Sequence, residues 1–148
     1  SRDLGDLEAA RTAYEESLAL RRQLRASLGD TPQALRDLSI SLDNVGRVSR
    51  DLGDLEAART AYEESLALRR QLRASLGDTP QALFDLAVTL HLLVQLEFKN
   101  GNAESAGMAY REGVTLADRL LAFQPDHDQY RKLREGFAQL DNPSKSIS

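Results

Sequence analysis

A perfect internal repeat organises the chain. Residues 1–35 and residues 49–83 are identical at every position, so the repeat period is 48 residues. Looser matches extend that period, since Gly53, Ala58, Tyr62 and Leu68 recur as Gly101, Ala106, Tyr110 and Leu116. A single unit of this size cannot bury its apolar side alone, whereas stacked copies cover one another. We therefore expect one repeat domain at residues 1–140, with units at 1–48, 49–96 and 97–140, and a flexible tail at 141–148.

Each unit contains the pattern of two helices. Thr31-Pro32 and Thr79-Pro80 pair a capping hydroxyl with a proline, which helices accept at their first position. Apolar residues then recur at intervals of three and four, and Gly53 follows as a helix-ending residue. The predicted helices cover residues 6–28, 32–52, 54–76, 80–100, 102–123 and 128–140, and no strand is expected. Short connections place neighbouring helices antiparallel, so the predicted fold class is all-α, an α-solenoid of helical hairpins.

Composition excludes several classes of protein. The chain has 148 residues and no Cys, which excludes a disulfide scaffold, a thiolate zinc site and a cysteine nucleophile. Its formal net charge is -4, so we expect no nucleic-acid partner. We find no apolar stretch of membrane-spanning length in the sequence, and we expect no membrane partner. The absence of Cys also fits a cytoplasmic protein, which is the location we expect.

No group of residues indicates catalysis. His91 lies in an apolar helix, where a lone histidine more often packs or lines a groove than binds a ligand. His127 stands between two aspartates, which suits a metal site or an ordinary turn with a helix cap, and we favour the turn. Arginine clusters at residues 21–25 and 69–73 would suit a phosphate backbone, but helix-end electrostatics and pairing with glutamates explain them more simply. We expect no enzymatic activity, no cofactor and no metal site.

A set of small and aromatic residues carries a family resemblance. They are Leu42, Val45, Gly46, Ser49, Ala58 and Tyr62, with Gly53-Asp54 in the turn between them. This pattern resembles the tetratricopeptide repeat family, in which two packed helices share small and aromatic positions at these spacings. Gly46 and Ala58 would let the two helices approach closely, and Tyr62 would fill the space beside them. The 48-residue period is longer than the family's usual length of about 34 residues, and it is similar to long-helix variants of the repeat.

The resemblance implies a right-handed superhelix of hairpins whose first helices line a concave face. It also implies that a peptide or protein segment binds there and that the protein catalyses no reaction. Carried over position by position, the concave face contains Asp43, Asn44, Arg47 and Arg50 in one unit and His91, Gln95 and Phe98 in the next. Asp43 would repel the C-terminal carboxylates that some members of the family bind, whereas Arg47 and Arg50 would attract an acidic peptide. The predicted function is therefore a non-enzymatic interaction scaffold for a protein or peptide partner.

The two ends of the repeat array differ. Residues 1–5 match the last turn of a first helix, so the helix at 6–28 lacks that partner, and we expect a fragment of a longer array or a trimmed chain. Residues 86–98 are apolar on almost every face, and the helix at 128–140 is expected to cap that end. Either capping or an apolar groove explains this excess of apolar residues. We expect a homo-oligomer through the N-terminal helix or the groove, and self-assembly or a spacer role without a separate ligand is the alternative function.

Overall fold

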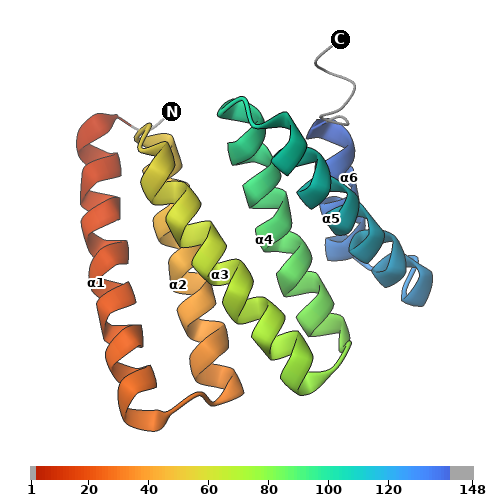
Figure 1. Cartoon of the computed structure of the whole chain (residues 1–148), viewed down its shortest axis with the longest axis horizontal. Coiled ribbons are helices and arrows are strands. Elements are labelled where there is room, and N and C mark those ends of the chain that lie inside the picture. Colours follow the sequence, from red (N-terminus) through yellow and green to blue (C-terminus); the bar gives the residue numbers. More distant parts are fainter. Residues whose placement is uncertain (1–2, 141–148) are drawn as a thin grey trace. The chain divides into compact units, whose positions relative to one another are not determined.

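The computed structural model describes residues 3–140, and these residues form six α-helices without a strand (Figure 1). The helices are α1 (Leu4–Leu28), α2 (Pro32–Asp51), α3 (Leu55–Leu76), α4 (Pro80–Lys99), α5 (Ala103–Phe123) and α6 (Asp128–Leu140). Short turns join them, and α1 packs against α2, α2 against α3, α4 against α5, and α5 against α6. The predicted fold class, an all-α repeat of the α-solenoid type, is confirmed. The tail expected at 141–148 lies outside the described residues.

Local sequence signals set the helix ends. Thr31 Oγ1 accepts a hydrogen bond from a backbone N–H of the first turn at 3.1 Å, and Thr79 repeats the arrangement at the start of α4. At the end of α2, Gly53 has φ +83°, and Asp54 N donates to Ser49 O at 2.8 Å. This is a Schellman-type helix end, which favours glycine because φ is positive. The predicted starts and stops at these positions are confirmed.

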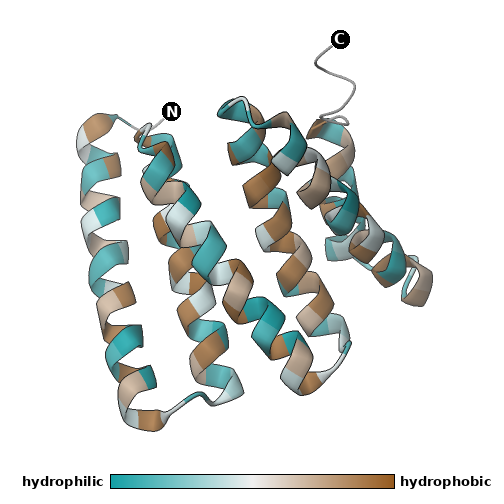
Figure 2. Cartoon of the chain, viewed as in Figure 1, coloured by the Kyte–Doolittle hydropathy of each residue, from teal (hydrophilic) through white to brown (hydrophobic). Residues whose placement is uncertain are grey.

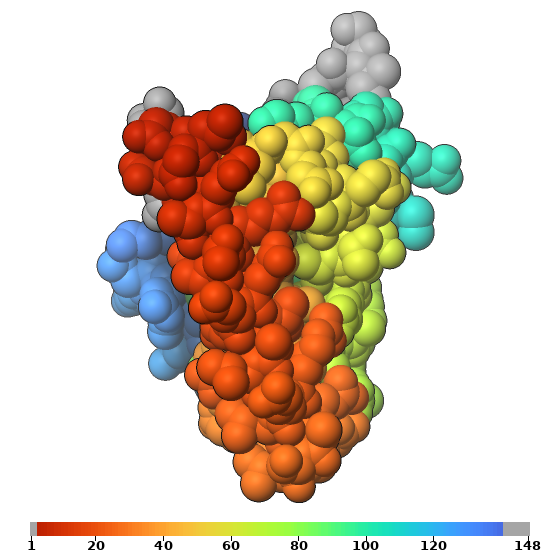
Figure 3. Space-filling view, turned by 90° about the vertical axis from the view of Figure 1, so that its left-hand side faces the viewer, coloured from red at the N-terminus to blue at the C-terminus, as the bar shows by residue number. Residues whose placement is uncertain are grey.

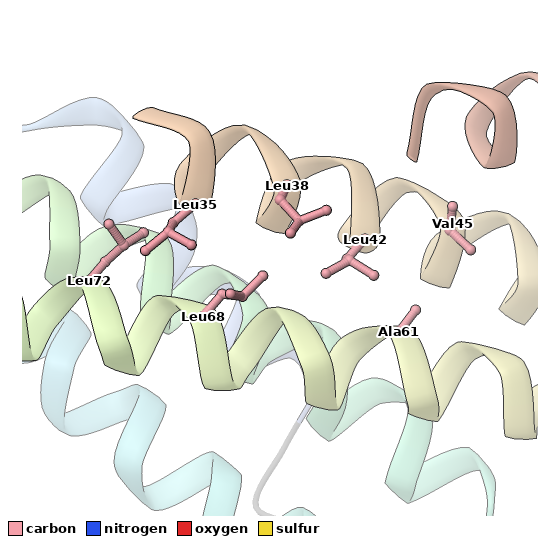
Figure 4. Close-up of a cluster of buried hydrophobic side chains, with 7 residues drawn as sticks. All are labelled: Leu35, Leu38, Leu42, Val45, Ala61, Leu68 and Leu72. Carbon is pink, nitrogen blue, oxygen red and sulfur yellow. The ribbon is translucent and has the colours of Figure 1, made fainter. Parts of the chain in front are cut away.

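The chain forms two compact units, residues 1–72 and 73–148. In the first unit, α2 packs against α1 and against α3. The apolar stripe of α2 meets apolar residues of α3 in one buried cluster (Figure 4). Its members are Leu35, Leu38, Leu42, Val45, Ala61, Leu68 and Leu72, and Tyr14 and Leu18 of α1 pack against it. The single domain expected over residues 1–140 stays a prediction.

The close approach of α2 and α3 depends on Gly46. A Cβ atom placed there would collide with the ring of Tyr62, with 2.6 Å to Cδ1. Tyr62 is 0% exposed, and so is Ala58 on the same helix. Because buried side chains pack as densely as organic crystals, the ring and a larger residue at position 46 cannot share this space. The sequence-based interpretation of Gly46 and Tyr62 is therefore confirmed.

The second unit contains α4, α5 and α6. α4 is apolar over most of its length (Figure 2) and packs against both α5 and α6. Phe137 of α6 is 0% exposed, and a Cβ atom on Gly113 of α5 would lie 2.6 Å from Phe137 Cε1. Tyr110 meets the same ring edge-on, with 6.0 Å between the ring centroids. α6 thus seals α4 and α5 in the way expected of a capping helix.

The length and composition of α4 correct one expectation. By these two measures its 20 residues could cross a membrane, so the premise that no stretch reaches such a length was wrong. It is the only such helix in residues 3–140, and 67% of its apolar window is buried inside the structure. Core helices have the same composition, so α4 is weak evidence for a membrane.

The first helix begins two residues earlier than predicted. α1 starts at Leu4 because the Asp3 side chain accepts a hydrogen bond from Asp6 N at 2.9 Å and caps the helix there. In the second copy of the repeat, the matching residues Leu52 and Gly53 form the turn after α2 instead. The same local sequence therefore starts a helix in one place and ends one in another.

Candidate functional site

The most accessible charged residues among the predicted contacts lie on α2. Arg47 is exposed, and its Nη1 donates to Asn44 Oδ1 at 3.2 Å. Arg50 is half-buried, and its Nε and Nη2 donate to Asp51 Oδ1 at 3.3 and 3.2 Å. One turn of helix separates Arg47 from Arg50, so both guanidinium groups leave the same side of α2. We call Asn44, Arg47 and Arg50 the α2 basic surface.

Asp43 does not belong to that surface. It is 2% exposed, and its Oδ2 lies 3.2 Å from Arg69 Nη2 of α3. The Nε of Arg69 also donates to Ser39 Oγ at 3.1 Å. The carboxylate of Asp43 is thus neutralised inside the α2–α3 packing, where it holds the two helices in register instead of facing a partner. Sequence reasoning missed this pair, because Arg69 was attributed to the helix-end arginine cluster.

The predicted contacts on α4 lie at a packed surface. His91, Gln95 and Phe98 are all half-buried. The ring of His91 meets Phe137 of α6 edge-on, with 5.0 Å between the centroids. A Cβ atom on Gly136 would lie 3.0 Å from His91 Nε2, so α6 passes directly beside this imidazole. His91 is therefore engaged with the capping helix, which leaves Gln95 and Phe98 as the α4 residues of interest for a partner.

Two family models match the chain, and both describe a tetratricopeptide repeat. One matches residues 40–73, from the middle of α2 to near the end of α3, and the other matches residues 1–24. The second segment has the same sequence as residues 49–72, so both matches concern one repeated motif. The chain belongs to the tetratricopeptide repeat family. No curated protein matches it.

The signature positions of the repeat are used for packing. All six residues that carried the resemblance are buried, namely Leu42, Val45, Gly46, Ser49, Ala58 and Tyr62. Tetratricopeptide repeats are generally protein–protein interaction modules, and the signature supplies their hairpin geometry. Between the signature residues of α2, Asn44 is half-buried and Arg47 is exposed.

The environment of Tyr62 does not support acid–base chemistry. Burial raises the pKa of its phenol to about 12, although nearby Arg50 and Arg47 oppose the shift. Its hydroxyl is buried and has no hydrogen-bond partner among the described residues. The phenol stays protonated at neutral pH and is enclosed. Within residues 3–140, no group of three or more His, Asp or Glu side chains is arranged to hold a metal ion.

The side chain of His127 packs against a neighbouring aromatic residue. Its ring stacks on Tyr130, with 3.6 Å between centroids and 9° between planes. Its backbone N donates to Gln124 O at 3.1 Å, which closes the turn ahead of α6. The neighbouring Asp128 pairs with Arg131 at 3.2 Å, and this arginine holds the pKa of the carboxyl below its usual value. These contacts fit the turn that we favoured over a metal site.

Proposed function

We propose that the chain is a non-enzymatic scaffold that binds an acidic peptide or protein segment on the α2 basic surface. Membership of the tetratricopeptide repeat family supports the broad class, since these repeats are generally protein–protein interaction modules. The observation that carries the finer proposal is the exposed guanidinium of Arg47, which is held by Asn44 on a helix that is buried on its other side. The α4 residues Gln95 and Phe98 are proposed as further contacts in the second unit.

The charges around α2 favour an acidic ligand. The contact of Arg47 with Asn44 is with a neutral amide, so it leaves the positive charge of the arginine uncancelled. Asp43, which would otherwise repel a carboxylate, is buried against Arg69 at 3.2 Å. A peptide carboxylate can therefore form a charge-assisted hydrogen bond with Arg47 without meeting a nearby uncompensated negative charge. Because Arg47 is exposed to solvent, salt should weaken this attraction strongly.

A charge-reversal pair tests the proposal. An array of acidic peptides and sequence-scrambled neutral peptides is presented to the chain, and the affinities of captured peptides are measured by fluorescence anisotropy. Arg47→Glu should weaken binding of an acidic peptide about tenfold or more, and higher salt should weaken binding to the original chain. Arg111→Glu is the matched control, because Arg111 is also exposed but lies on α5. Equal affinities of both variants, or a preference for neutral peptides, would rule out the α2 basic surface.

Self-assembly is the second candidate function, and exposed leucines of α1 favour it. Leu20 and Leu28 are 60% and 65% exposed, and Leu24 is 44% exposed. Apolar side chains grouped on one helix are a usual feature of association surfaces. Light scattering over a range of concentrations distinguishes the two functions. A monomer that captures peptides supports the scaffold, and an oligomer that captures none supports self-assembly.

A further inference from the structure

Arg47 lies on a part of α2 that its neighbours in the first unit leave open. α1, red to orange in Figure 3, stands at the front of this unit and packs against one side of α2. α3 packs against another side through the buried cluster in Figure 4. Arg47 is exposed outside both contacts, near the C-terminal end of α2. The charges at this end of the helix therefore determine which anionic group a peptide can place there.

One edge of the Arg47 guanidinium group is open to a ligand. Its Nη1 donates to Asn44 Oδ1 at 3.2 Å, which is the only hydrogen bond that this side chain makes within residues 3–140. The Nε and Nη2 donors remain, and they form the edge that binds a planar carboxylate through two parallel hydrogen bonds. A single carboxylate of a peptide can therefore neutralise Arg47.

The same edge of Arg50 is matched with an acidic neighbour. Its Nε and Nη2 donate to Asp51 Oδ1 at 3.3 and 3.2 Å. The Asp51 side chain is 48% exposed, and in the described part of the chain its carboxylate hydrogen-bonds only to Arg50. The copy of Asp51 in the first repeat, Asp3, caps the start of a helix, whereas Asp51 is the last residue of one. Asp51 thus has no capping role, and its negative charge offsets that of Arg50.

The net charge at this end of α2 equals that of one arginine. Burial raises the pKa of Tyr62 to about 12, and four charged groups also act on this phenol. They are Arg50, Arg47, Asp43 and Asp51, so all four lie around one point of the α2–α3 contact. Asp43 is already neutralised inside the helix packing. Because Asp51 offsets Arg50, the positive charge that a ligand meets is that of Arg47 alone.

A single uncancelled arginine suits a singly charged ligand group. The attraction of a ligand to the arginine rises in proportion to the ligand's charge, whereas the cost of removing water from the ligand rises with the square of that charge. A carboxylate has a charge of about -1, and a phosphoserine has a charge of about -1.5 to -2 at neutral pH. The helix dipole also adds roughly half a negative charge at the C-terminal end of α2, which disfavours a doubly charged group further.

We propose that Asp51 restricts the α2 basic surface to peptides that present the side-chain carboxylate of a glutamate or aspartate, and that it disfavours phosphorylated peptides. Asp51 acts by offsetting the charge of Arg50, so it determines specificity without touching the ligand. The proposal rests on the scaffold function proposed above, and it adds the chemical class of the bound group and the residue that selects it.

Three end-blocked peptides with one glycine–serine frame test the proposal, and they carry glutamate, phosphoserine or glutamine at the central position. Binding to the full chain is followed by the NMR shift of the Arg47 Nε–Hε signal at about pH 7.5, where phosphoserine is almost doubly charged. The original chain should bind the phosphoserine peptide at most about threefold more tightly than the glutamate peptide. Asp51→Asn should raise the affinity about threefold for the glutamate peptide and roughly ninefold for the phosphoserine peptide, because the Coulomb energy doubles with the ligand's charge. Asp126→Asn is the matched control, because it removes the same charge from an exposed turn before α6 and should change neither affinity.

Two outcomes would overturn the role of Asp51 and leave the scaffold function intact. The first is a preference of the original chain for the phosphoserine peptide beyond that threefold limit, because both arginines would then act on the phosphate. The second is a ratio of the two affinities that Asp51→Asn changes no more than Asp126→Asn does. A third outcome would overturn both proposals, namely that neither charged peptide shifts the Arg47 signal more than the glutamine peptide does at millimolar concentration.

Discussion

The repeat provides a matched pair of substitutions, Leu68→Ala and Leu20→Ala. The two leucines occupy the same place in identical 35-residue segments, so changes in helix propensity and in the unfolded chain are the same for both. Only their surroundings differ, since Leu68 is 5% exposed and Leu20 is 60% exposed. Any difference in the free energy of unfolding between the two variants therefore reports tertiary burial alone.

The expected difference follows from the two exposures. Leu68 belongs to the buried cluster of the first unit, and truncating a buried leucine to alanine costs about 2–5 kcal/mol, including the cavity left behind. Leu20 is mostly in water, where substitutions change stability by roughly 0.5 kcal/mol. We expect Leu68→Ala to be less stable than Leu20→Ala by about 2–3 kcal/mol. For a chain of this length, that corresponds to roughly 4–12 °C in the melting temperature.

Urea denaturation followed by far-ultraviolet circular dichroism measures this difference. The two variants and the original chain are compared at low and high protein concentration, because association through the exposed leucines of α1 would make stability depend on concentration. Losses of stability that agree within about 0.5 kcal/mol at low concentration would refute the reasoning, because Leu20 would then be as covered as Leu68.

Two further predictions concern the α2–α3 contact and one acidic side chain. Gly46→Ala should cost about 1–3 kcal/mol in thermal unfolding, and a Tyr62→Leu background should remove much of that cost in a double-mutant cycle. Arg73 and Arg119 lower the pKa of Asp78 from 3.8 to about 2, so its stabilising contribution is present above pH 3.8 and is lost as the pH falls towards about 2. Arg119→Gln should raise the Asp78 pKa in an NMR titration, and an unchanged midpoint would contradict the second ion pair.

Much of the fold could be predicted from local signals. The caps at Thr31 and Thr79 and the stop at Gly53 depend on groups within a few residues of one another, and all three were found in place. The apolar stripe of α2 was also predicted, because intervals of three and four residues put side chains on one face of a helix whatever covers it.

The candidate site was less predictable. Asp43 and Arg47 lie four residues apart on α2, and the sequence placed both among the partner contacts. The structure buries Asp43 against Arg69 and leaves Arg47 exposed. Periodicity marks which positions share a helix face, but it does not tell how far the neighbouring helix extends over the edge of that face. His91 was uncertain for the same reason, since its contact with Phe137 joins residues far apart in the chain.

The two identical segments show which properties follow from the sequence and which follow from the tertiary structure. Sequence alone determined that both segments become helices with one leucine-rich side, because that side is set by the spacing of residues along a single helix. Tertiary structure alone decided that Leu68 is buried and Leu20 is exposed, and that Gly53 turns the chain while Gly5 continues a helix. The physical reason is that burial is defined by the atoms of other segments, and two copies of one sequence have different neighbours.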